Sequence, residues 1–321
     1  MQWKKILKNN FTNLDHLADF LQLSDADRKQ LLLQKKSFPL FLPFRLAQKM
    51  QKGTLKDPIL KQYVPLNQES INLPGYQKDP VEDNTFKITD KLLQKYNGRV
   101  LLLTTGACAM HCRFCFRQNY DYVSSKTGFQ KELNWIKNNP HIYEVILSGG
   151  DPLSLSDEIL EELLKSLNDI RHIKFIRFHT RFIIGIPERI TKSLLSFFSN
   201  CKKQIYFVLH INHYLELDPA IEKVLKKLQA ANVQILSQTV LLKDINDNVF
   251  TLKNLFFHLS SIGVQPYYLH QFDKINGGHH FYVNIEKGKE LMQELLAVLP
   301  GYAVPRYVQE IPRKKNKVPI F

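Results

Sequence analysis

Short apolar runs alternate with amphipathic stretches along most of the chain from about residue 98 onward. The runs have the length of strands, and the stretches between them repeat their apolar residues at helical spacing. Six strands are predicted at 99–104, 143–148, 174–179, 204–210, 233–241 and 264–270, with helices near 126–139, 157–170, 188–200, 218–231, 248–262 and 286–298. Strands that are apolar almost throughout are typical of a parallel sheet covered by helices, so the pattern predicts an α/β fold. Ligands bind such sheets where the strands end.

The first 90 residues lack this alternation and are predicted to form a helical, irregular extension. Leu14–Leu21 carries apolar residues at helical spacing, and Ser24 is placed to cap a second helix over 24–28. From Pro39 to Pro80 the chain is rich in proline and polar residues, with little regular periodicity. We expect this extension to wrap one end of the α/β part.

Composition adds a large core and a basic surface to this picture. The 321 residues are 44% hydrophobic, and 44 Lys and Arg against 30 Asp and Glu give a net charge of +14. Nucleic acid would suit that charge, but the basic residues are spread along the chain apart from its start and residues 313–317, so nucleic-acid binding is not favoured. The longest apolar candidate, Phe38–Phe44, is short and interrupted by proline, and no apolar signal region follows Lys4 and Lys5. A cytoplasmic protein with no membrane contact is predicted.

Three closely spaced cysteines, Cys108, Cys112 and Cys115, carry the most specific chemistry of the chain. Three thiolates on a short loop can hold a [4Fe-4S] cluster and leave one iron open to bind and activate a small molecule. A zinc knuckle completed by His111 is an alternative, although the spacing is not a usual zinc pattern, and a disulfide is disfavoured by sparse cysteine usage that suits a reducing compartment. The fourth cysteine, Cys201, is interpreted as an unreactive buried or half-buried thiol.

Further polar residues follow the predicted strands. The pair Gly149 and Gly150, with Asp151, follows the second strand, where glycines permit close approach to a ligand and a carboxylate can accept from an ammonium group. Arg117 lies two residues beyond the last cysteine of the loop and could hold a carboxylate bidentately. Read alone, these residues also fit an ordinary turn and an ion-paired arginine.

The cysteine spacing and these motifs resemble those of radical S-adenosylmethionine (SAM) enzymes, and more closely the lysine 2,3-aminomutase family. Within it, the chain resembles the short branch that makes β-lysine for modifying translation elongation factor P. The resemblance runs from about Phe38 to the C-terminus, with further matches at 36–40, 51–53, 57–60 and 96–101. It implies a partial (β/α)6 radical SAM barrel over 91–300, an N-terminal mainly helical extension over 1–90 and a C-terminal segment over 301–321.

The resemblance assigns the cofactors. The three cysteines would hold the [4Fe-4S] cluster, and SAM would be bound by Gly149, Gly150, Asp151, His210 and Gln238. Lys317, in Asn316–Pro319 and preceded by the matching segment Gly301–Pro305, corresponds to the lysine that forms a Schiff base with pyridoxal 5′-phosphate (PLP). Arg99 and Tyr96 resemble residues around PLP, with Arg99 on its phosphate. Without the family, Lys317 would be one cation of a basic tail, and His210 and Gln238 would be satisfied polar groups at a sheet edge.

The resemblance also implies the substrate, L-α-lysine, which would be converted to β-lysine. Arg117 would bind its carboxylate, Asp273 its distal ammonium group, and Glu310 lies where the long branch carries a second aspartate, so the side-chain length departs from that branch. Two carboxylates at a buried site select a cationic side chain and reject an acidic one. Either acid could instead be a solvated loop residue.

Asn248 lies near a position where the long branch carries a zinc-binding cysteine, and the sequence ends at Phe321. No zinc is therefore expected, and the long branch's oligomeric arrangement is in doubt, although a homo-oligomer is possible. A flavodoxin or ferredoxin would supply electrons, and a separate ligase would attach β-lysine to elongation factor P. The alternatives are an aminomutase for free β-lysine metabolism or another amino acid, a basic RNA-modifying or RNA-binding iron–sulfur protein, and a non-catalytic iron–sulfur protein.

Overall fold

The structure is a computed structural model that describes residues 2–31, 38–123 and 128–321. Part of the expected family match at 36–40 and the start of the helix expected at 126–139 lie outside the described residues. Within the described ranges no helix has the length and apolar character needed to cross a membrane.

One sheet forms the centre of the molecule, and its strands are neighbours in the order in which they occur along the chain. The six predicted strands are all present, and each agrees with its predicted bounds to within about one residue. They pair in parallel from β3 to β8, and β9 continues the parallel order. The strands are β1 Lys87–Thr89, β2 Leu92–Leu93, β3 Arg99–Thr105, β4 Glu144–Gly149, β5 Phe175–Thr180, β6 Gln204–His210, β7 Val233–Val240, β8 Gln265–His270, β9 Arg306–Gln309 and β10 Val318–Pro319.

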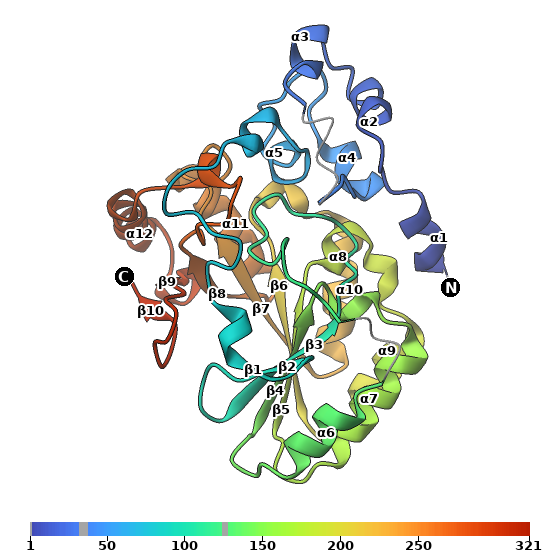
Figure 1. The fold of residues 1–321 in the computed structure, drawn as a ribbon. Coiled ribbons are helices and arrows are strands. Elements are labelled where there is room, and N and C mark those ends of the chain that lie inside the picture. The colour runs from blue at the N-terminus through green and yellow to red at the C-terminus, as the bar shows by residue number, and fades with distance from the viewer. Residues whose placement is uncertain (1, 32–37, 124–127) are drawn as a thin grey trace.

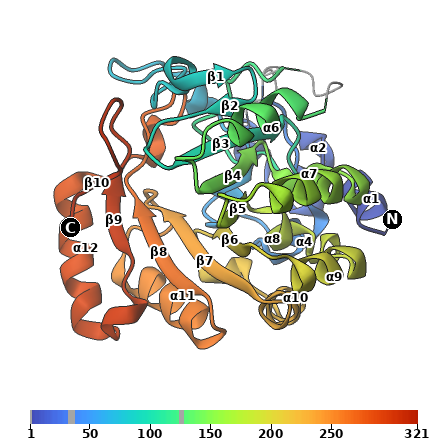
Figure 2. The ribbon, with the colours of Figure 1, turned by 90° about the horizontal axis from the view of Figure 1, so that it is seen from below.

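The sheet curves into an arc with helices along its outer side, which is the partial (β/α)6 barrel expected for a radical SAM enzyme (Figure 2). Each predicted helix lies near its expected position. The helix expected over 188–200 is divided, because the Thr191 side chain accepts from the N–H of Leu194 and caps a shorter helix. The helices are α6 Gln130–Lys137, α7 Asp157–Asp169, α8 Phe182–Gly185, α9 Lys192–Asn200, α10 Pro219–Ala230, α11 Val249–Ser261 and α12 Ile285–Val298.

The N-terminal extension lies over one end of this arc (Figure 1). Its helices are α1 Gln2–Lys8, α2 Leu14–Phe20, α3 Asp25–Arg28, α4 Phe44–Lys49 and α5 Leu60–Tyr63, and Ser24 caps α3 as predicted. Short 3-10 helices complete the structure at η1 Asn67–Ser70, η2 Asp83–Phe86, η3 Pro152–Ser154, η4 Pro187–Arg189, η5 Tyr214–Glu216, η6 His279–Phe281 and η7 Gly301–Ala303. Helix α4 packs on α8 and η5, and η1 packs on η6, so the extension covers the loops that follow β5, β6 and β8.

Four strands were not predicted, and they add an edge at each end of the barrel. Strands β1 and β2 are antiparallel additions beside β3, and β10 is antiparallel to β9. All four are too short for a hydrophobic period to be read from the sequence. They bring residues on both sides of the expected boundaries at 90/91 and 300/301 into one sheet, and the division into 1–90, 91–300 and 301–321 stays a prediction.

Candidate active site

A cavity of about 420 Å³ opens inside the arc toward the carboxyl ends of the strands. Every site residue predicted from the sequence lines it. These residues are Tyr96, Arg99, Cys108, Cys112, Cys115, Arg117, Gly149, Gly150, Asp151, His210, Gln238, Asp273, Glu310 and Lys317. Residues more than 200 positions apart in the chain therefore share one site, as expected when parallel strands end at the same edge.

The cysteine loop follows β3 and is anchored by the N-terminal extension. Asn10 donates its side-chain amide to the carbonyl of Ala109 at 2.7 Å, and the N–H of His111 donates to the carbonyl of Phe41 at 2.9 Å. The His111 ring nitrogen Nδ1 lies 2.9 Å from the carbonyl of Pro39. This contact fixes the orientation of the His111 ring against the extension.

The three cysteines of the loop are free and half-buried. Burial raises the pKa of all three, that of Cys115 to about 11, and the Arg181 guanidinium donates to Cys112 Sγ at 3.1 Å. Among the described residues, no three His, Cys, Asp or Glu side chains are arranged to hold a metal ion. A four-iron cluster holds its thiolates farther apart than a single ion holds its ligands, and iron binding itself stabilises thiolates. A free, half-buried three-cysteine loop thus fits a cluster.

The glycine pair packs the second loop against the cysteine loop. A Cβ at Gly149 would lie 2.6 Å from the carbonyl oxygen of Thr105, and one at Gly150 would lie 2.4 Å from that of Ala107. Gly149 also has a φ of +115°. The sequence interpretation attributed the glycines to close approach of a ligand, whereas the structure shows close approach between two loops of the same site.

Asp151 is engaged inside the protein. Its carboxylate accepts from the backbone N–H groups of Leu153, Arg181 and Phe182 at 2.8–3.0 Å, and from the hydroxyl of Thr180 at 2.9 Å. Burial raises its pKa to about 6 against the effect of these donors. A carboxylate has about four acceptor positions, and these contacts fill them. In this structure Asp151 therefore ties the loop after β4 to the end of β5, and it presents no free oxygen to an ammonium group.

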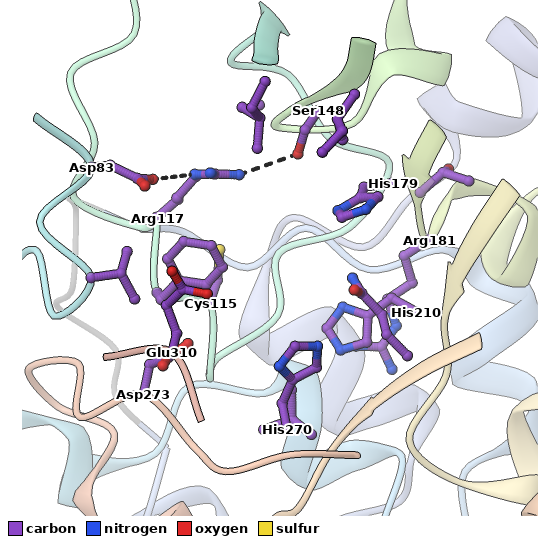
Figure 3. Close-up of a pocket in the computed structure, with 18 of the residues that line it drawn as sticks. Asp83, Cys115, Arg117, Ser148, His179, Arg181, His210, His270, Asp273 and Glu310 are labelled. Carbon is purple, nitrogen blue, oxygen red and sulfur yellow. Dashed lines mark hydrogen bonds and ion pairs between the residues drawn. The ribbon is translucent and has the colours of Figure 1, made fainter. Parts of the chain in front are cut away.

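Arg117 is aimed into the cavity by two partners (Figure 3). Its Nε donates to Asp83 Oδ2 at 2.7 Å, and one terminal nitrogen donates to Ser148 Oγ at 3.2 Å. Burial disfavours the charge on Asp83, but Arg117 and Lys95 outweigh it and hold the pKa of that carboxyl below its ordinary value. The guanidinium has five N–H donors, so donors remain for an anion in the cavity.

Lys317 lies on the C-terminal segment just before β10, with its Nζ 2.7 Å from Glu310 Oε2. The hydroxyl of Tyr96 donates to the same carboxylate at 2.7 and 2.9 Å, and Lys95 Nζ lies 3.7 Å from it. Burial opposes the charge on Glu310, yet Lys317 and Lys95 hold its pKa below the ordinary value. The structure thus joins three predicted residues, Tyr96, Glu310 and Lys317, in one network, and Glu310 contacts the lysine directly.

Asp273 follows β8 and lies near this network (Figure 3). Burial raises the pKa of its carboxyl to about 7, and the neighbouring Glu310 adds to the effect while Lys317 opposes it. Within the described ranges, its side chain makes no hydrogen bond or ion pair. A half-buried carboxylate without a partner can attract a cation that enters the cavity.

The remaining wall holds residues that the sequence interpretation missed. His210 and Gln238, both expected to contact SAM, are direct neighbours across β6 and β7, and His179 and His270 join them in the cavity (Figure 3). Burial lowers the pKa of all three histidines well below the ordinary value, so the rings are neutral near neutral pH. Among described residues, Nε2 of His179 and of His210 has no hydrogen-bond partner. Position at the carboxyl end of a strand was the available signal, since His210 and His270 end their strands and His179 is the last residue but one of β5.

The other singled-out residues lie elsewhere. Cys201 follows α9 as a half-buried thiol, as predicted, with its sulfur 3.5 Å from Asn168 Oδ1. Asn248 caps α11, accepting from the N–H of Thr251 at 2.9 Å. The expectation that no zinc is bound stays a prediction.

Comparisons with known proteins identify the family of the chain. A family model described as a 4Fe-4S single cluster domain matches residues 96–192. The chain is 40% identical to L-lysine 2,3-aminomutase of Escherichia coli over 99% of this chain and 94% of that protein. It is 36% identical to L-lysine 2,3-aminomutase of Haemophilus influenzae over 98% of this chain and 94% of that protein. A solved structure of the radical SAM methyltransferase TsrM from Kitasatospora setae matches with a TM-score of 0.38 and 9% identity, covering 54% of this chain and 35% of that one. The chain therefore belongs to the lysine 2,3-aminomutase family of isomerases.

Proposed function

We propose that this protein is a radical SAM, PLP-dependent lysine 2,3-aminomutase that converts L-α-lysine to β-lysine. The observation that carries the proposal is the shared cavity. The cysteine loop, Lys317, Arg117 and the two acids Asp273 and Glu310 line the same space. An iron–sulfur electron carrier would need neither a cavity-facing lysine nor an arginine held for an anion.

The three cysteines would hold the cluster, and the residues at the ends of β4, β6 and β7 would surround SAM. When bound, the cluster would supply one electron for the cleavage of SAM, and this chemistry belongs to the cofactors rather than to the protein. The chain's share is to hold the loop and exclude water. The extension over the strand ends and the buried histidines serve the second purpose.

The residues around Lys317 fit PLP. When bound, PLP supplies a carbonyl that captures a primary amine and a ring that accepts electron density. Lys317 offers the amine, and its Nζ lies 6.0 Å from the centroid of the Tyr268 ring. Arg99 and Arg177 line the cavity and share Glu144, whose Oε2 lies 3.9 Å from Arg99 Nε and 3.0 Å from a terminal nitrogen of Arg177. Each guanidinium keeps further N–H donors that could contact a phosphate. Arg99 would thus contact the phosphate, as the resemblance implies, and Arg177 would assist it.

Lysine would be held at both ends. Arg117 would take the carboxylate with the N–H donors that Asp83 and Ser148 leave free. Asp273 would take the distal ammonium group, with Glu310 beside it once Lys317 is engaged by the cofactor. Fixing both ends positions the carbon between them, and positioning is a large part of what a protein contributes to such a reaction.

We further propose that the β-lysine serves elongation factor P through a separate ligase, and that the protein works in the cytoplasm with a flavodoxin or ferredoxin as electron donor. These points rest on the resemblance to the short branch, which the 94% coverage of the Escherichia coli relative supports. A cell-based comparison of elongation factor P mass with and without this protein tests the first of them.

The test of the activity is an anaerobic assay with reconstituted cluster, PLP, SAM, dithionite and L-lysine, read by chiral chromatography with mass detection. The proposal expects β-lysine from the wild type and none from Lys317→Ala. Lys314→Ala is the matched control, because Lys314 is an exposed lysine of the same tail, and it should retain activity. Intact cofactors and SAM cleavage without any lysine isomer would refute the lysine assignment.

A further inference from the structure

Arg181 directly follows β5, lines the cavity and contacts the cysteine loop through Cys112. One terminal nitrogen donates to Cys112 Sγ at 3.1 Å, and the side chain is only 6% exposed. A cationic donor on a cluster-ligand sulfur, away from bulk water, acts on that sulfur with little screening.

The guanidinium is fixed by contacts on several sides. Its second terminal nitrogen donates to Gln62 Oε1 and to Glu216 Oε2, both at 2.6 Å. The guanidinium carbon lies 4.9 Å from the ring centroid of Tyr63 and 5.3 Å from that of Phe114. Arg181 therefore has little freedom to leave the sulfur.

Glu216 is itself occupied on its far side. Its Oε1 accepts from the backbone N–H groups of Asn212 and His213 at 3.0 and 2.9 Å, and from the Gln62 amide at 3.2 Å. These three N–H donors partly offset the negative charge of the Glu216 carboxylate. The net electrostatic effect of the Arg181–Glu216 pair at the Cys112 sulfur is therefore that of a positive charge.

We propose that Arg181 sets the reduction potential of the [4Fe-4S] cluster by donating a hydrogen bond to the Cys112 sulfur. Hydrogen bonds to the sulfurs, net charge and solvent exposure determine the potentials of such clusters. Reduction by one electron from an external donor adds one negative charge to the cluster and its thiolates. A fixed cation beside a thiolate stabilises the reduced form more than the oxidised form, so Arg181 makes reduction easier.

The test is an EPR-monitored redox titration of the reconstituted protein, with no PLP, lysine or SAM present. Arg181→Met should lower the equilibrium constant for one-electron reduction at least tenfold, which is a shift of about 59 mV to a more negative potential. Arg181→Lys keeps the charge and should shift the potential less. Glu216→Gln removes the opposing charge and should shift the potential in the positive direction.

Arg189 provides the matched control. It is fully buried, pairs with Asp157 at 2.6 Å and donates to the carbonyl of Leu155, with no contact to the cysteines. Arg189→Met should destabilise the fold and leave the potential of the bound cluster unchanged.

A wild-type potential in Arg181→Met with full iron and sulfide content would overturn the proposal. If that variant does not fold, unchanged potentials in both Arg181→Lys and Glu216→Gln would overturn it. The titration depends on the cluster alone, so its outcome is separate from that of the lysine turnover assay.

Discussion

The buried ion pair between Glu69 and Arg113 should contribute strongly to both the fold and the cluster site. Arg113 lies between Cys112 and Cys115, and Glu69 belongs to η1 of the N-terminal extension. Arg113 Nε lies 2.9 Å from Glu69 Oε1 and one terminal nitrogen lies 2.5 Å from Oε2, with side-chain exposures of 0% and 2%. The pair is a fully enclosed link between the extension and the cysteine loop.

Glu69→Ala would leave the Arg113 charge buried without its carboxylate. Removing one partner of a buried pair costs about 3–5 kcal/mol, because the remaining charge keeps its desolvation cost. That is a large fraction of the roughly 5–15 kcal/mol by which folded domains are stable. Arg113 anchors the cysteine loop, so the loop should become more mobile in this variant. The variant should therefore retain less iron after reconstitution.

The measurement is urea unfolding of the apoprotein by circular dichroism, together with iron content after reconstitution. Asp19→Ala is the control: Asp19 pairs with Arg28 at a similar distance of 2.6 Å, but the two side chains are 68% and 32% exposed. An exposed pair is worth about 0–1 kcal/mol. Equal losses of unfolding free energy in the two variants, or full iron content in Glu69→Ala, would refute the reasoning.

Three further predictions concern the cavity. Gly150→Ala should reduce iron content after reconstitution, since its Cβ would lie 2.4 Å from the carbonyl oxygen of Ala107; normal iron content would contradict this. The pKa of Asp273 is about 7, so its carboxyl is neutral below that pH and charged above it. The KM for lysine should fall as pH rises through about 7, and Asp273→Asn should remove this dependence; a variant with the wild-type profile would exclude Asp273 as the ammonium site. Asp83→Asn should raise the KM for lysine about tenfold with a smaller effect on kcat, because a hydrogen bond to a charged group contributes about 1.5–3 kcal/mol and Asp83 orients Arg117. An unchanged KM would argue against that positioning role.

The strands of the barrel could be predicted from the sequence because the parallel strands are long and apolar. Strand β6, for example, was predicted at 204–210 and is observed over Gln204–His210. Strands β9 and β10 were missed since they have four and two residues, and their pairing depends on contacts across the sheet rather than on a local period.

The site was predicted through motifs, so residues outside motifs were missed. The spacing of the cysteines marked the loop, and Lys317 was found through the family. Nothing local marks Arg181, whose contacts with Gln62 and Cys112 span 119 and 69 positions. The role of Asp151 was also hidden, since its partners at residues 180–182 become neighbours only when β4 and β5 pair.

The central claim is that the cluster side and the Lys317 side of the cavity act on one lysine molecule. The most direct test follows deuterium from L-lysine labelled at carbon 3 into 5′-deoxyadenosine, read by mass spectrometry after anaerobic turnover. The account predicts deuterium transfer in the wild type and none in Lys317→Ala. Deuterium-free 5′-deoxyadenosine from a wild-type protein that cleaves SAM in the presence of lysine would contradict it.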